Sequence, residues 1–366
     1  MPGEKIRLGI IGANATYGWS MRAHLPALLA LPEFELTAVC TSRPETAAES
    51  AKAYGAKMAF HDYREMVNHQ DIDLVAVSVR VPLHHDMVMA ALEAGKHVFC
   101  EWPLGANLAE AQEMASLARS KGVRHMVGLQ ARGAPPLLRL RELLAEGYVG
   151  EMLACSMTMF LPGLLQRGLG MAWMADRSKG ANTHTIATGH AIDAFCLCVG
   201  EFKELSARVA TRVPVWDTGE PGKTVAVNAA DNVLISGILA NGAVASAHIA
   251  TVPWHGTGWR MEVYGREGTL VATSRGMVQY SNIQLHGAHG NEAGLEELTI
   301  PEGLTQVPEG MPAGEPFNLG QMYLKLNQAI REGRGADPDF DLAVKRHQLL
   351  ELMQRSSDVG RALEVP

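Results

Sequence analysis

The sequence carries little positive charge. Its 366 residues include 32 Lys and Arg against 39 Asp and Glu, which gives a formal net charge of −7. Proteins that bind nucleic acid gain much of their affinity from clustered Lys and Arg side chains that contact phosphates. We therefore expect no nucleic-acid partner.

The sequence also lacks a long apolar run. No stretch reaches the roughly 18 consecutive apolar residues that indicate a membrane-spanning helix. The opening residues, MPGEKIRLGIIGA, hold no extended apolar segment followed by a cleavage site. These absences predict that the protein has no membrane partner.

Cysteine is scarce and scattered. The five cysteines, an odd number, are Cys40, Cys100, Cys155, Cys196 and Cys198. Most lie inside apolar runs, which argues against a disulfide framework and indicates buried thiols in a reducing compartment. We expect a cytoplasmic protein. The closely spaced Cys196 and Cys198 lack the spacing and partner ligands of a zinc site, so no metal is expected.

The first third of the sequence alternates strand-like and helix-like stretches. Short β-branched runs such as IRLGIIGA (6–13) and FELTAVCTS (34–42) are followed by helical ones such as PETAAESAKAYG (44–55) and the stretch capped by Asn107. Strands that are buried on both faces by crossover helices read as continuous apolar runs. The pattern predicts an α/β domain with a parallel, doubly wound sheet over residues 1–131.

The remainder of the chain has a different pattern, with longer alternating stretches. Asn241-Gly242 lies between two apolar runs and is a strong hairpin signal. The run THTIATGHAIDAFCLCVG (183–200) is typical of a helix, and residues 301–318, rich in Pro and Gly, of a surface loop. We expect residues 132–366 to form an α/β domain with a large, mostly antiparallel open sheet.

A glycine-bearing turn joins the first strand to the first helix. Such a turn presents backbone N–H groups that bind a pyrophosphate, as in a Rossmann dinucleotide-binding domain. The usual G-x-G-x-x-G pattern is broken here, because Asn14 occupies the second glycine position. A plain strand–helix turn is the alternative, although the surrounding alternation favours nucleotide binding. The cofactor-binding residues expected in this turn are Gly12, Asn14, Ala15, Gly18 and Trp19.

The second strand ends without a carboxylate. An NAD site usually offers one there for the ribose 2′-hydroxyl, whereas Ser42 and Arg43 suit a 2′-phosphate. NADP is therefore favoured over NAD. The alternative is that Arg43 only caps a solvated turn.

Two longer stretches carry a family resemblance. The stretch DLVAVSVRVPLHHDMVMAALEAGKHVFCEWPLGANLAEAQEMASLA (73–118), followed later by HAIDAFCLCVG (190–200), resembles the Gfo/Idh/MocA oxidoreductase family. Within that family the chain is similar to the branch of galactose-pathway regulators, with which it shares Glu-Trp in place of Glu-Lys. The resemblance implies an N-terminal Rossmann domain and a C-terminal α/β domain whose open sheet supports a homodimer or homotetramer.

The resemblance leaves the function open between two classes. It implies an NAD(P)-dependent oxidoreductase that acts on a CH–OH group of a small-molecule substrate: a sugar, a polyol or a related hydroxy or carbonyl compound. A cofactor-recycling glycosidase is a further enzymatic alternative. The regulator branch implies instead a non-catalytic, dinucleotide-binding sensor.

The sequence departs from the catalytic members of the family at two positions. Trp102 stands where the family has a lysine, and Ile186 where it has an aspartate. Neither side chain can exchange a proton at neutral pH. The indole of Trp102 is expected to stack on the nicotinamide or on a sugar ring. The resemblance places Val79, His85, Glu101 and Trp102 at the cofactor and Trp102 also at the substrate.

His190 is the titratable residue of the motif that remains. It could serve as the acid or base of hydride transfer, orient the substrate or cofactor, or pack as a structural histidine. Lys179 and His184 are further catalytic candidates, with a solvated loop lysine and a helix-start histidine as the alternatives. Arg132 and Asp193 are candidate substrate-binding residues, and an ordinary salt bridge is equally compatible with Arg132.

Overall fold

The computed structural model describes residues 3–280 and 282–366. The chain divides into two compact units. Unit 1 comprises Met1–Gly133 and Gln306–Lys345, and unit 2 comprises Ala134–Thr305 and Arg346–Pro366. Each unit has its own sheet, described separately below.

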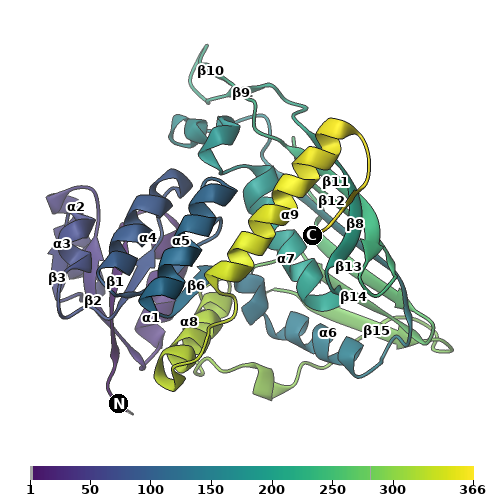
Figure 1. Cartoon of the computed structure of the whole chain (residues 1–366), viewed down its shortest axis with the longest axis horizontal. Coiled ribbons are helices and arrows are strands. Elements are labelled where there is room, and N and C mark those ends of the chain that lie inside the picture. Colours follow the sequence, from purple (N-terminus) through teal and green to yellow (C-terminus); the bar gives the residue numbers. More distant parts are fainter. Residues whose placement is uncertain (1–2, 281) are drawn as a thin grey trace. The chain divides into compact units, whose positions relative to one another are not determined.

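Unit 1 is built on a six-stranded parallel sheet with the order β3-β2-β1-β4-β5-β6. This is the doubly wound topology predicted from the sequence, and the order of the strands along the sheet reverses between β1 and β4. Strands β1, β2, β3 and β6 are labelled in Figure 1. The strands are β1 (Ile6–Ile11), β2 (Phe34–Cys40), β3 (Met58–Phe60), β4 (Leu74–Val77), β5 (His97–Glu101) and β6 (His125–Gly128).

Two helices of unit 1 have the boundary residues that the sequence predicts. The side chain of Asn107 accepts a hydrogen bond from the Glu110 N–H, and Gly55 ends its helix in the left-handed conformation. The helices are η1 (Ser20–His24, a π-helix), α1 (Leu25–Ala30), α2 (Pro44–Tyr54), α3 (Tyr63–Val67), α4 (His84–Glu93), α5 (Leu108–Lys121) and α8 (Glu315–Glu332), with short 3₁₀ turns η2 (Val81–Leu83) and η3 (Gln130–Gly133).

Helix α8 belongs to the core of unit 1, although it follows the antiparallel sheet in sequence. Its side chains Leu319, Met322 and Tyr323 are fully buried in one cluster with Leu8 and Phe99 of the parallel sheet. The division of the sequence into residues 1–131 and 132–366 therefore differs from the two compact units. The reason is that the apolar face of α8 is buried by packing on the first sheet.

The stretch 301–318 forms the predicted surface loop over residues 301–313, with two anchored side chains and a helix at its end. Val307 and Met311 are buried in the core of unit 1, and α8 begins at Glu315. The rest of residues 301–313, which include the 3₁₀ turn η7 (Glu302–Leu304), is exposed apart from the half-buried Leu304. Pro and Gly correctly indicated irregular backbone but carried no information about its burial.

Unit 2 is built on a nine-stranded mixed sheet with the order β16-β15-β14-β13-β7-β12-β11-β8-β17. All neighbouring strands are antiparallel except β7 and β12, which are parallel. The strands are β7 (Met152–Pro162), β8 (Phe202–Ala210), β11 (Asn232–Leu239), β12 (Val244–Val252), β13 (Gly258–Gly265), β14 (Gly268–Ser274), β15 (Gln284–His289), β16 (Glu296–Glu297) and β17 (Leu363–Glu364), with a separate hairpin of β9 (Val215–Asp217) and β10 (Thr224–Ala226).

The predicted hairpin at Asn241-Gly242 is confirmed. It joins β11 to β12, with Gly242 at a φ of 91° and the Asn241 side chain accepting a hydrogen bond from the Ala243 N–H. Positive φ is accessible to glycine without steric cost, and the asparagine side chain satisfies a turn donor.

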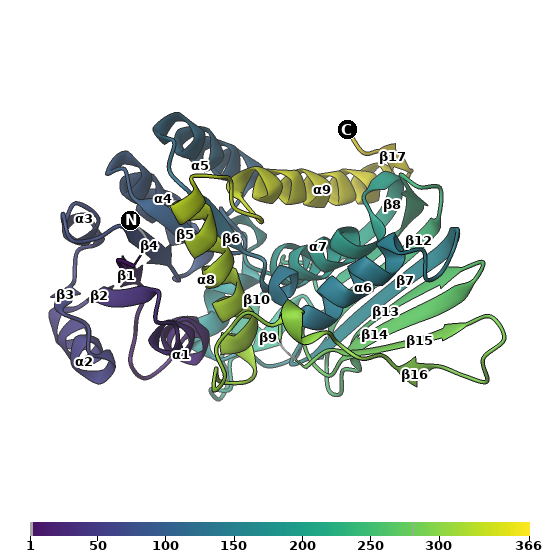
Figure 2. The ribbon, with the colours of Figure 1, turned by 90° about the horizontal axis from the view of Figure 1, so that it is seen from below.

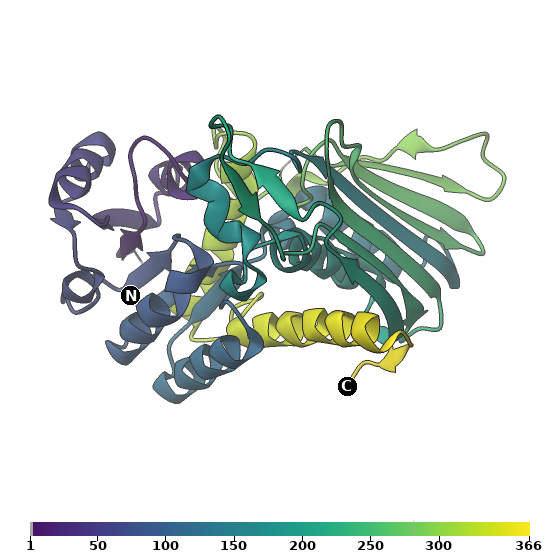
Figure 3. The same cartoon turned by 90° about the horizontal axis from the view of Figure 1, so that it is seen from above.

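The two faces of this sheet have different surroundings. Figure 2 shows α6 (Pro135–Ala145) and α7 (Thr188–Val199) lying on one face. In Figure 3 the C-terminal part of α9 (Phe340–Val359, yellow) runs toward β8, where Ser356 and Ser357 accept hydrogen bonds from strand N–H groups.

The opposite face exposes Leu234, Val244 and Tyr264. Apolar side chains on an open sheet face suit an interface between subunits. The expected homodimer or homotetramer stays a prediction.

None of the helices in the described ranges is both long enough and apolar enough to cross a membrane. The five cysteines are all buried and free.

A buried ion pair crosses the core of unit 2. Arg346 of α9 donates from Nε to Asp193 Oδ1 of α7 at 2.8 Å. Its two terminal nitrogens donate to the two carboxylate oxygens of Glu201 at 2.8 and 2.9 Å. The side chains of Arg346 and Asp193 are almost fully buried. This arrangement fixes α9 against α7 and assigns Asp193 a structural partner.

We expect Arg346→Met to lower the free energy of unfolding by about 3–5 kcal/mol, because it leaves the buried carboxylate of Asp193 without its counter-ion. Urea denaturation followed by circular dichroism measures this loss. The exposed Arg355 on the same helix provides the control, and Arg355→Met is expected to change stability by less than about 0.5 kcal/mol. Equal losses in the two variants would contradict the structural role of the ion pair.

Candidate functional site

The carboxyl ends of β1 and β4 approach each other at Gly12. This glycine has a φ of 90°, and a Cβ built on it would lie 2.1 Å from the carbonyl oxygen of Ser78 and 2.8 Å from a side-chain carbon of Val79. Only glycine allows this approach. The N–H of Gly12 also donates to Cys40 O at 2.9 Å, so the end of β2 lies next to Gly12 as well. Gly12 and Val79, two predicted cofactor residues, therefore lie together at the switch point of the sheet.

The loop that follows suits a pyrophosphate. Within residues 3–280 and 282–366, the backbone N–H groups of Ala15, Tyr17 and Gly18 donate no hydrogen bond. Unpaired amide donors at the switch point of a doubly wound sheet are the groups that bind dinucleotide phosphates. The residues present thus fit the phosphate part of a dinucleotide.

Asn14 shows how the loop tolerates the broken glycine pattern. Its Oδ1 accepts from both N and Oγ1 of Thr16, each at 2.9 Å. No non-glycine residue in the described part of the chain has a positive φ, so the backbone at Asn14 does not require glycine. The side chain folds back on its own loop as in an Asx-turn. Trp19, at the end of this loop, has the Arg22 guanidinium 5.9 Å from its ring centroid.

Ser42 and Arg43 follow β2 on the neighbouring strand end. Both residues are exposed, and Arg43 is the residue before α2. Its carbonyl oxygen accepts hydrogen bonds from the hydroxyls of Thr41 and Thr46, which fixes the backbone of the turn. Ser42 and Arg43 thus follow the strand whose last carbonyl, Cys40 O, accepts from the Gly12 N–H.

Two adjacent histidines begin α4 and have different surroundings. His84 is buried, with its ring nitrogens 2.9 Å from Pro103 O and 3.1 Å from Val79 O, so it links the segments that follow β4 and β5. His85, the predicted cofactor residue, is partly exposed, and its Nε2 lies 2.9 Å from Glu113 Oε2. Burial opposes protonation of His85, but the hydrogen bonds to Glu113 and Asp86 raise its pKa overall. Its contact with a cofactor stays a prediction.

Glu101 ends β5 and is largely buried. Its carboxylate lies 2.8 Å from His24 Nε2 and accepts from Gln130 Nε2 at 3.0 and 2.8 Å. His24 Nδ1 in turn lies 2.6 Å from the hydroxyl of Tyr323 in α8. Sequence reasoning identified Glu101 but missed His24, Gln130 and Tyr323. A buried carboxylate is expected to have hydrogen-bond partners, but this expectation does not identify the partner residues in the sequence.

The residue after Glu101, Trp102, is 4% exposed. Little of its indole surface is therefore available for the stacking predicted from the sequence. The peptide bond between Trp102 and Pro103 is cis. A buried indole beside a buried carboxylate gives this strand end an apolar wall in place of a lysine ammonium.

Arg132 lies in unit 1, just after β6, and is buried. Its Nη1 donates to Asp337 Oδ1 at 2.9 Å, and its carbonyl oxygen accepts from Lys325 Nζ at 2.6 Å. Asp337 itself is exposed. The salt-bridge alternative therefore describes the observed contact, and a role in substrate binding stays a prediction.

The three predicted catalytic residues lie in unit 2. His190 is in the first turn of α7 and is 5% exposed, whereas Lys179 is exposed in the 3₁₀ turn η5 (Arg177–Lys179). His184 is in the π-helix η6 (Thr183–Ala187), whose first turn is held by a capping box at Asn182. The hydroxyl of Thr183 bonds that of Thr251 at the end of β12, so η6 lies at the carboxyl end of that strand.

His184 is poorly suited to proton transfer near neutral pH. Burial lowers its pKa to about 4, although a hydrogen bond with the Leu350 backbone opposes the shift. The imidazole is therefore neutral at pH 7 and a weak base. Asp193 is likewise engaged by Arg346 in the core. These surroundings give both residues structural roles, while their predicted roles in catalysis and substrate binding stay predictions.

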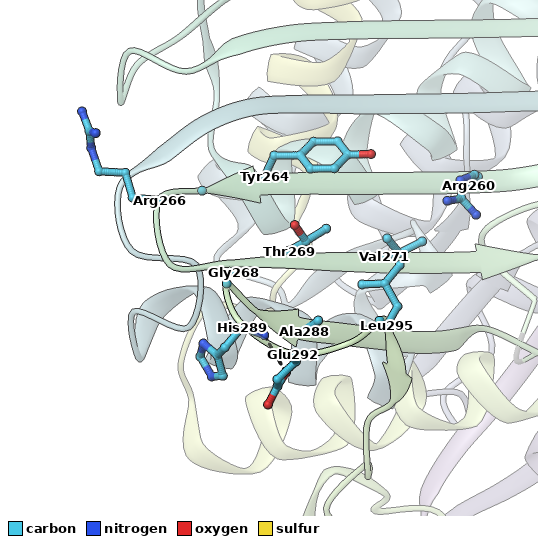
Figure 4. A pocket seen from close by; sticks show the side chains of 13 residues that line it. Arg260, Tyr264, Arg266, Gly268, Thr269, Val271, Ala288, His289, Glu292 and Leu295 are labelled. Atoms are coloured by element: carbon cyan, nitrogen blue, oxygen red, sulfur yellow. Dashed lines mark hydrogen bonds between the residues drawn. The ribbon is translucent and has the colours of Figure 1, made fainter.

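A separate hollow of about 390 Å³ lies on the open face of the unit 2 sheet (Figure 4). It is lined by residues of β13, β14 and β15, among them Arg260, Tyr264 and His289. Both arginines that line the hollow have a carboxylate partner, since Arg260 pairs with Glu262 at 2.7 Å and Arg266 pairs with Glu151. The hollow contains none of the predicted site residues. In the described residues no group of three or more His, Cys, Asp or Glu side chains is arranged to hold a metal ion.

Two family models match the chain. Residues 6–129 match the oxidoreductase family with an NAD-binding Rossmann fold, and residues 135–274 match the C-terminal domain of Gal80p.

Three known proteins illustrate the similarity. The dehydrogenase aclE of Aspergillus oryzae is 38% identical over 217 residues, which are 58% of this chain and 59% of that protein. The chain thus matches about three fifths of that relative's length. The galactose/lactose metabolism regulatory protein GAL80 of Saccharomyces cerevisiae is 27% identical over 65% of this chain and 59% of its own. The levoglucosan dehydrogenase of Pseudarthrobacter phenanthrenivorans is 28% identical over 73% of each chain.

Solved structures share the fold over nearly the whole length. A super-repressor mutant of Gal80p from Saccharomyces cerevisiae has a TM-score of 0.86 at 22% identity and covers 99% of both chains. A levoglucosan dehydrogenase in complex with NADH and levoglucosan has a TM-score of 0.85 at 24% identity, covering 99% of this chain and 100% of that one. At these identities the likeness concerns the fold.

We expect the free energy of unfolding to fall as the pH is lowered from about 6.5 to about 4. Burial lowers the pKa of His184 and of His347 to about 4. An unfolded histidine has a pKa of about 6.5, so in this window the unfolded chain binds protons that the folded chain does not. Each histidine contributes up to about 1.4 kcal/mol per pH unit, or about 2 kcal/mol by pH 5.

Urea denaturation of wild type and His184→Gln at pH 7 and pH 5 measures this dependence. The variant is expected to lose less stability between the two pH values than wild type does. His255, which is exposed in the same unit, provides the control variant His255→Gln. A pH dependence that is the same in all three proteins would rule out the neutral, buried state of His184.

Proposed function

Because the chain belongs to the Gfo/Idh/MocA oxidoreductase family, in its Gal80-like branch, we propose that it is an NAD(P)-dependent oxidoreductase acting on the CH–OH group of a sugar, a polyol or a related compound. The observation that carries this proposal is the Gly12 turn. It combines a close approach of β1 to the end of β4 with unpaired amide donors at the switch point of a doubly wound sheet.

Residues of unit 1 have the binding roles in this proposal. The N–H groups of Ala15, Tyr17 and Gly18 bind the pyrophosphate, and Ser42 and Arg43 bind the ribose of the adenosine half. When bound, the nicotinamide ring supplies the hydride-transfer chemistry.

His190 of unit 2 is the proton-transfer residue in this proposal. It accepts or donates the proton at the substrate oxygen, because Trp102 and Ile186 have no proton to exchange. Lys179 is the second candidate for this role, since its ammonium is exposed in a turn close in sequence to α7.

A second function is favoured by Trp102 and by the family match of unit 2. Trp102 is buried and apolar where the related motif has lysine, and residues 135–274 match the C-terminal domain of a regulatory protein. A non-catalytic sensor would bind the dinucleotide through the same loop and need no proton-transfer residue. The two proposals therefore share cofactor binding and differ in turnover.

Turnover across a panel of sugars and polyols, followed by NAD(P)H absorbance, separates these functions. His190→Ala is expected to reduce turnover by about 10²–10⁴-fold, the usual contribution of a general acid or base, without changing the dissociation constant of the cofactor. Loss of turnover in Lys179→Ala but not in His190→Ala would transfer the role to the lysine. Cofactor binding with no turnover on any substrate would favour the sensor.

We expect NADP to bind more tightly than NAD, because Arg43 can pair with the 2′-phosphate. Arg43→Ala should weaken NADP binding by about ten- to hundredfold, the scale of a charge-assisted hydrogen bond, and leave NAD binding nearly unchanged. Isothermal titration calorimetry with both cofactors measures the two effects. The exposed Arg64, in the same unit, provides the control Arg64→Ala. Equal weakening of NAD and NADP in Arg43→Ala would contradict a phosphate-specific contact.

A further inference from the structure

The carboxylate of Glu101 is held in a fixed position at the end of β5. One N–H donor from His24 and the amide nitrogen of Gln130 contact its two oxygens at distances between 2.8 and 3.0 Å. The side chain is 12% exposed. A carboxyl group that receives N–H donors on both oxygens is satisfied in its charged form. In the described residues no Lys or Arg forms an ion pair with Glu101.

The hydrogen bonds behind Glu101 continue through His24 to Tyr323. Burial raises the pKa of Tyr323 well above its usual range, and the negative charge of Glu101 raises it further. The phenol therefore keeps its proton, and its oxygen lies 2.6 Å from His24 Nδ1. The other ring nitrogen, Nε2, lies 2.8 Å from Glu101 Oε1, so the imidazole of His24 bridges the phenol and the carboxylate and holds the carboxylate in place.

The sheet topology places this charge in the half of unit 1 opposite the phosphate loop. A dinucleotide lies across the switch point of a doubly wound sheet, with one mononucleotide on each side. The Gly12 turn and Arg43 lie at the ends of β1 and β2, so the adenosine half belongs to that side. The nicotinamide half then belongs to the ends of β4, β5 and β6, and Glu101 is the last residue of β5.

We propose that Glu101 is a redox-discriminating residue, whose fixed negative charge stabilises the oxidised, cationic nicotinamide relative to the reduced, neutral one. His24, Gln130 and Tyr323 are its positioning residues. This inference rests on the proposed binding of a nicotinamide dinucleotide to unit 1. Trp102, which replaces the lysine of the related motif, adds no positive charge beside it.

The substitution Glu101→Gln removes the charge while keeping the shape of the side chain. The Oε1 atom of Gln130 is buried and has no hydrogen-bond partner within residues 3–280 and 282–366. After rotation of the Gln130 amide, this oxygen can accept from the amide nitrogen introduced at position 101. The amide oxygen introduced at position 101 can still accept from His24. The variant is therefore expected to fold, which circular dichroism checks directly.

The measurement is the ratio of the dissociation constants of the oxidised and reduced cofactors, determined by calorimetry for NADP⁺ and NADPH and again for NAD⁺ and NADH. In Glu101→Gln we expect the ratio to shift by about tenfold in favour of the reduced form, the scale of one charge–charge interaction near a protein surface. The same shift corresponds to a rise of about 30 mV in the midpoint potential of the bound cofactor.

Three variants control this experiment. Glu93→Gln removes an exposed carboxylate from the same unit and should leave the ratio unchanged. His24→Leu removes the donor that holds Glu101 and should shift the ratio in the same direction as Glu101→Gln. His24→Gln retains an N–H donor and should shift it less, which a purely structural role of His24 would not produce.

The outcomes separate this inference from the proposed function. If wild type binds the cofactors and Glu101→Gln weakens the binding of the oxidised and reduced forms equally, the proposed discrimination by charge is overturned, whereas the proposed binding of a dinucleotide stands. The same conclusion follows if Glu93→Gln produces an equal shift. If wild type binds neither form of either cofactor, this inference and the proposed function are overturned together.

Discussion

The close approach of Gly12 to the backbone of Ser78 is the constraint on which the site in unit 1 depends. No side chain fits where a Cβ would lie 2.1 Å from a carbonyl oxygen, so the end of β1 can lie against the end of β4 only because residue 12 is glycine. The N–H groups of Gly12 and Ala13 also donate to Cys40 O, which brings the end of β2 to the same point. The loop with the unpaired amides and the residue Arg43 therefore both lie at the carboxyl ends of the strands.

The sequence was sufficient to predict the parallel sheet, the caps at Asn107 and Gly55, and the Asn241-Gly242 hairpin, because each depends on residues that are close in sequence. The place of α8 could not be predicted in this way. Its period of apolar residues indicates a helix with one buried face but not which sheet covers that face. Tyr323 meets His24 across 299 positions of the chain, and no local pattern reports such a contact.

The residues of the candidate site show the same difference between local patterns and long-range contacts. Gly12 and Glu101 were identified because they belong to a turn and a motif, whereas His24 and Gln130 became visible only through their hydrogen bonds to Glu101. The adjacent histidines of α4 show the same limit. Consecutive helical residues point about 100° apart, so one ring can be buried while its neighbour is exposed, and sequence alone does not say which. The structure buries His84 and leaves His85 at the surface.

The proposed charge of Glu101 has a consequence for both functional alternatives. An enzyme that oxidises an alcohol must bind the oxidised cofactor and release the reduced one, and a fixed negative charge near the nicotinamide favours that order. A sensor of cellular redox state needs the same discrimination, because a site that binds both forms equally cannot respond to their ratio. Trp102 and Ile186 have no proton to exchange, so turnover depends on His190 or Lys179, and its loss there would not affect this discrimination. The buried network around Glu101 therefore serves either function, and the proton-transfer capacity of unit 2 is what distinguishes them.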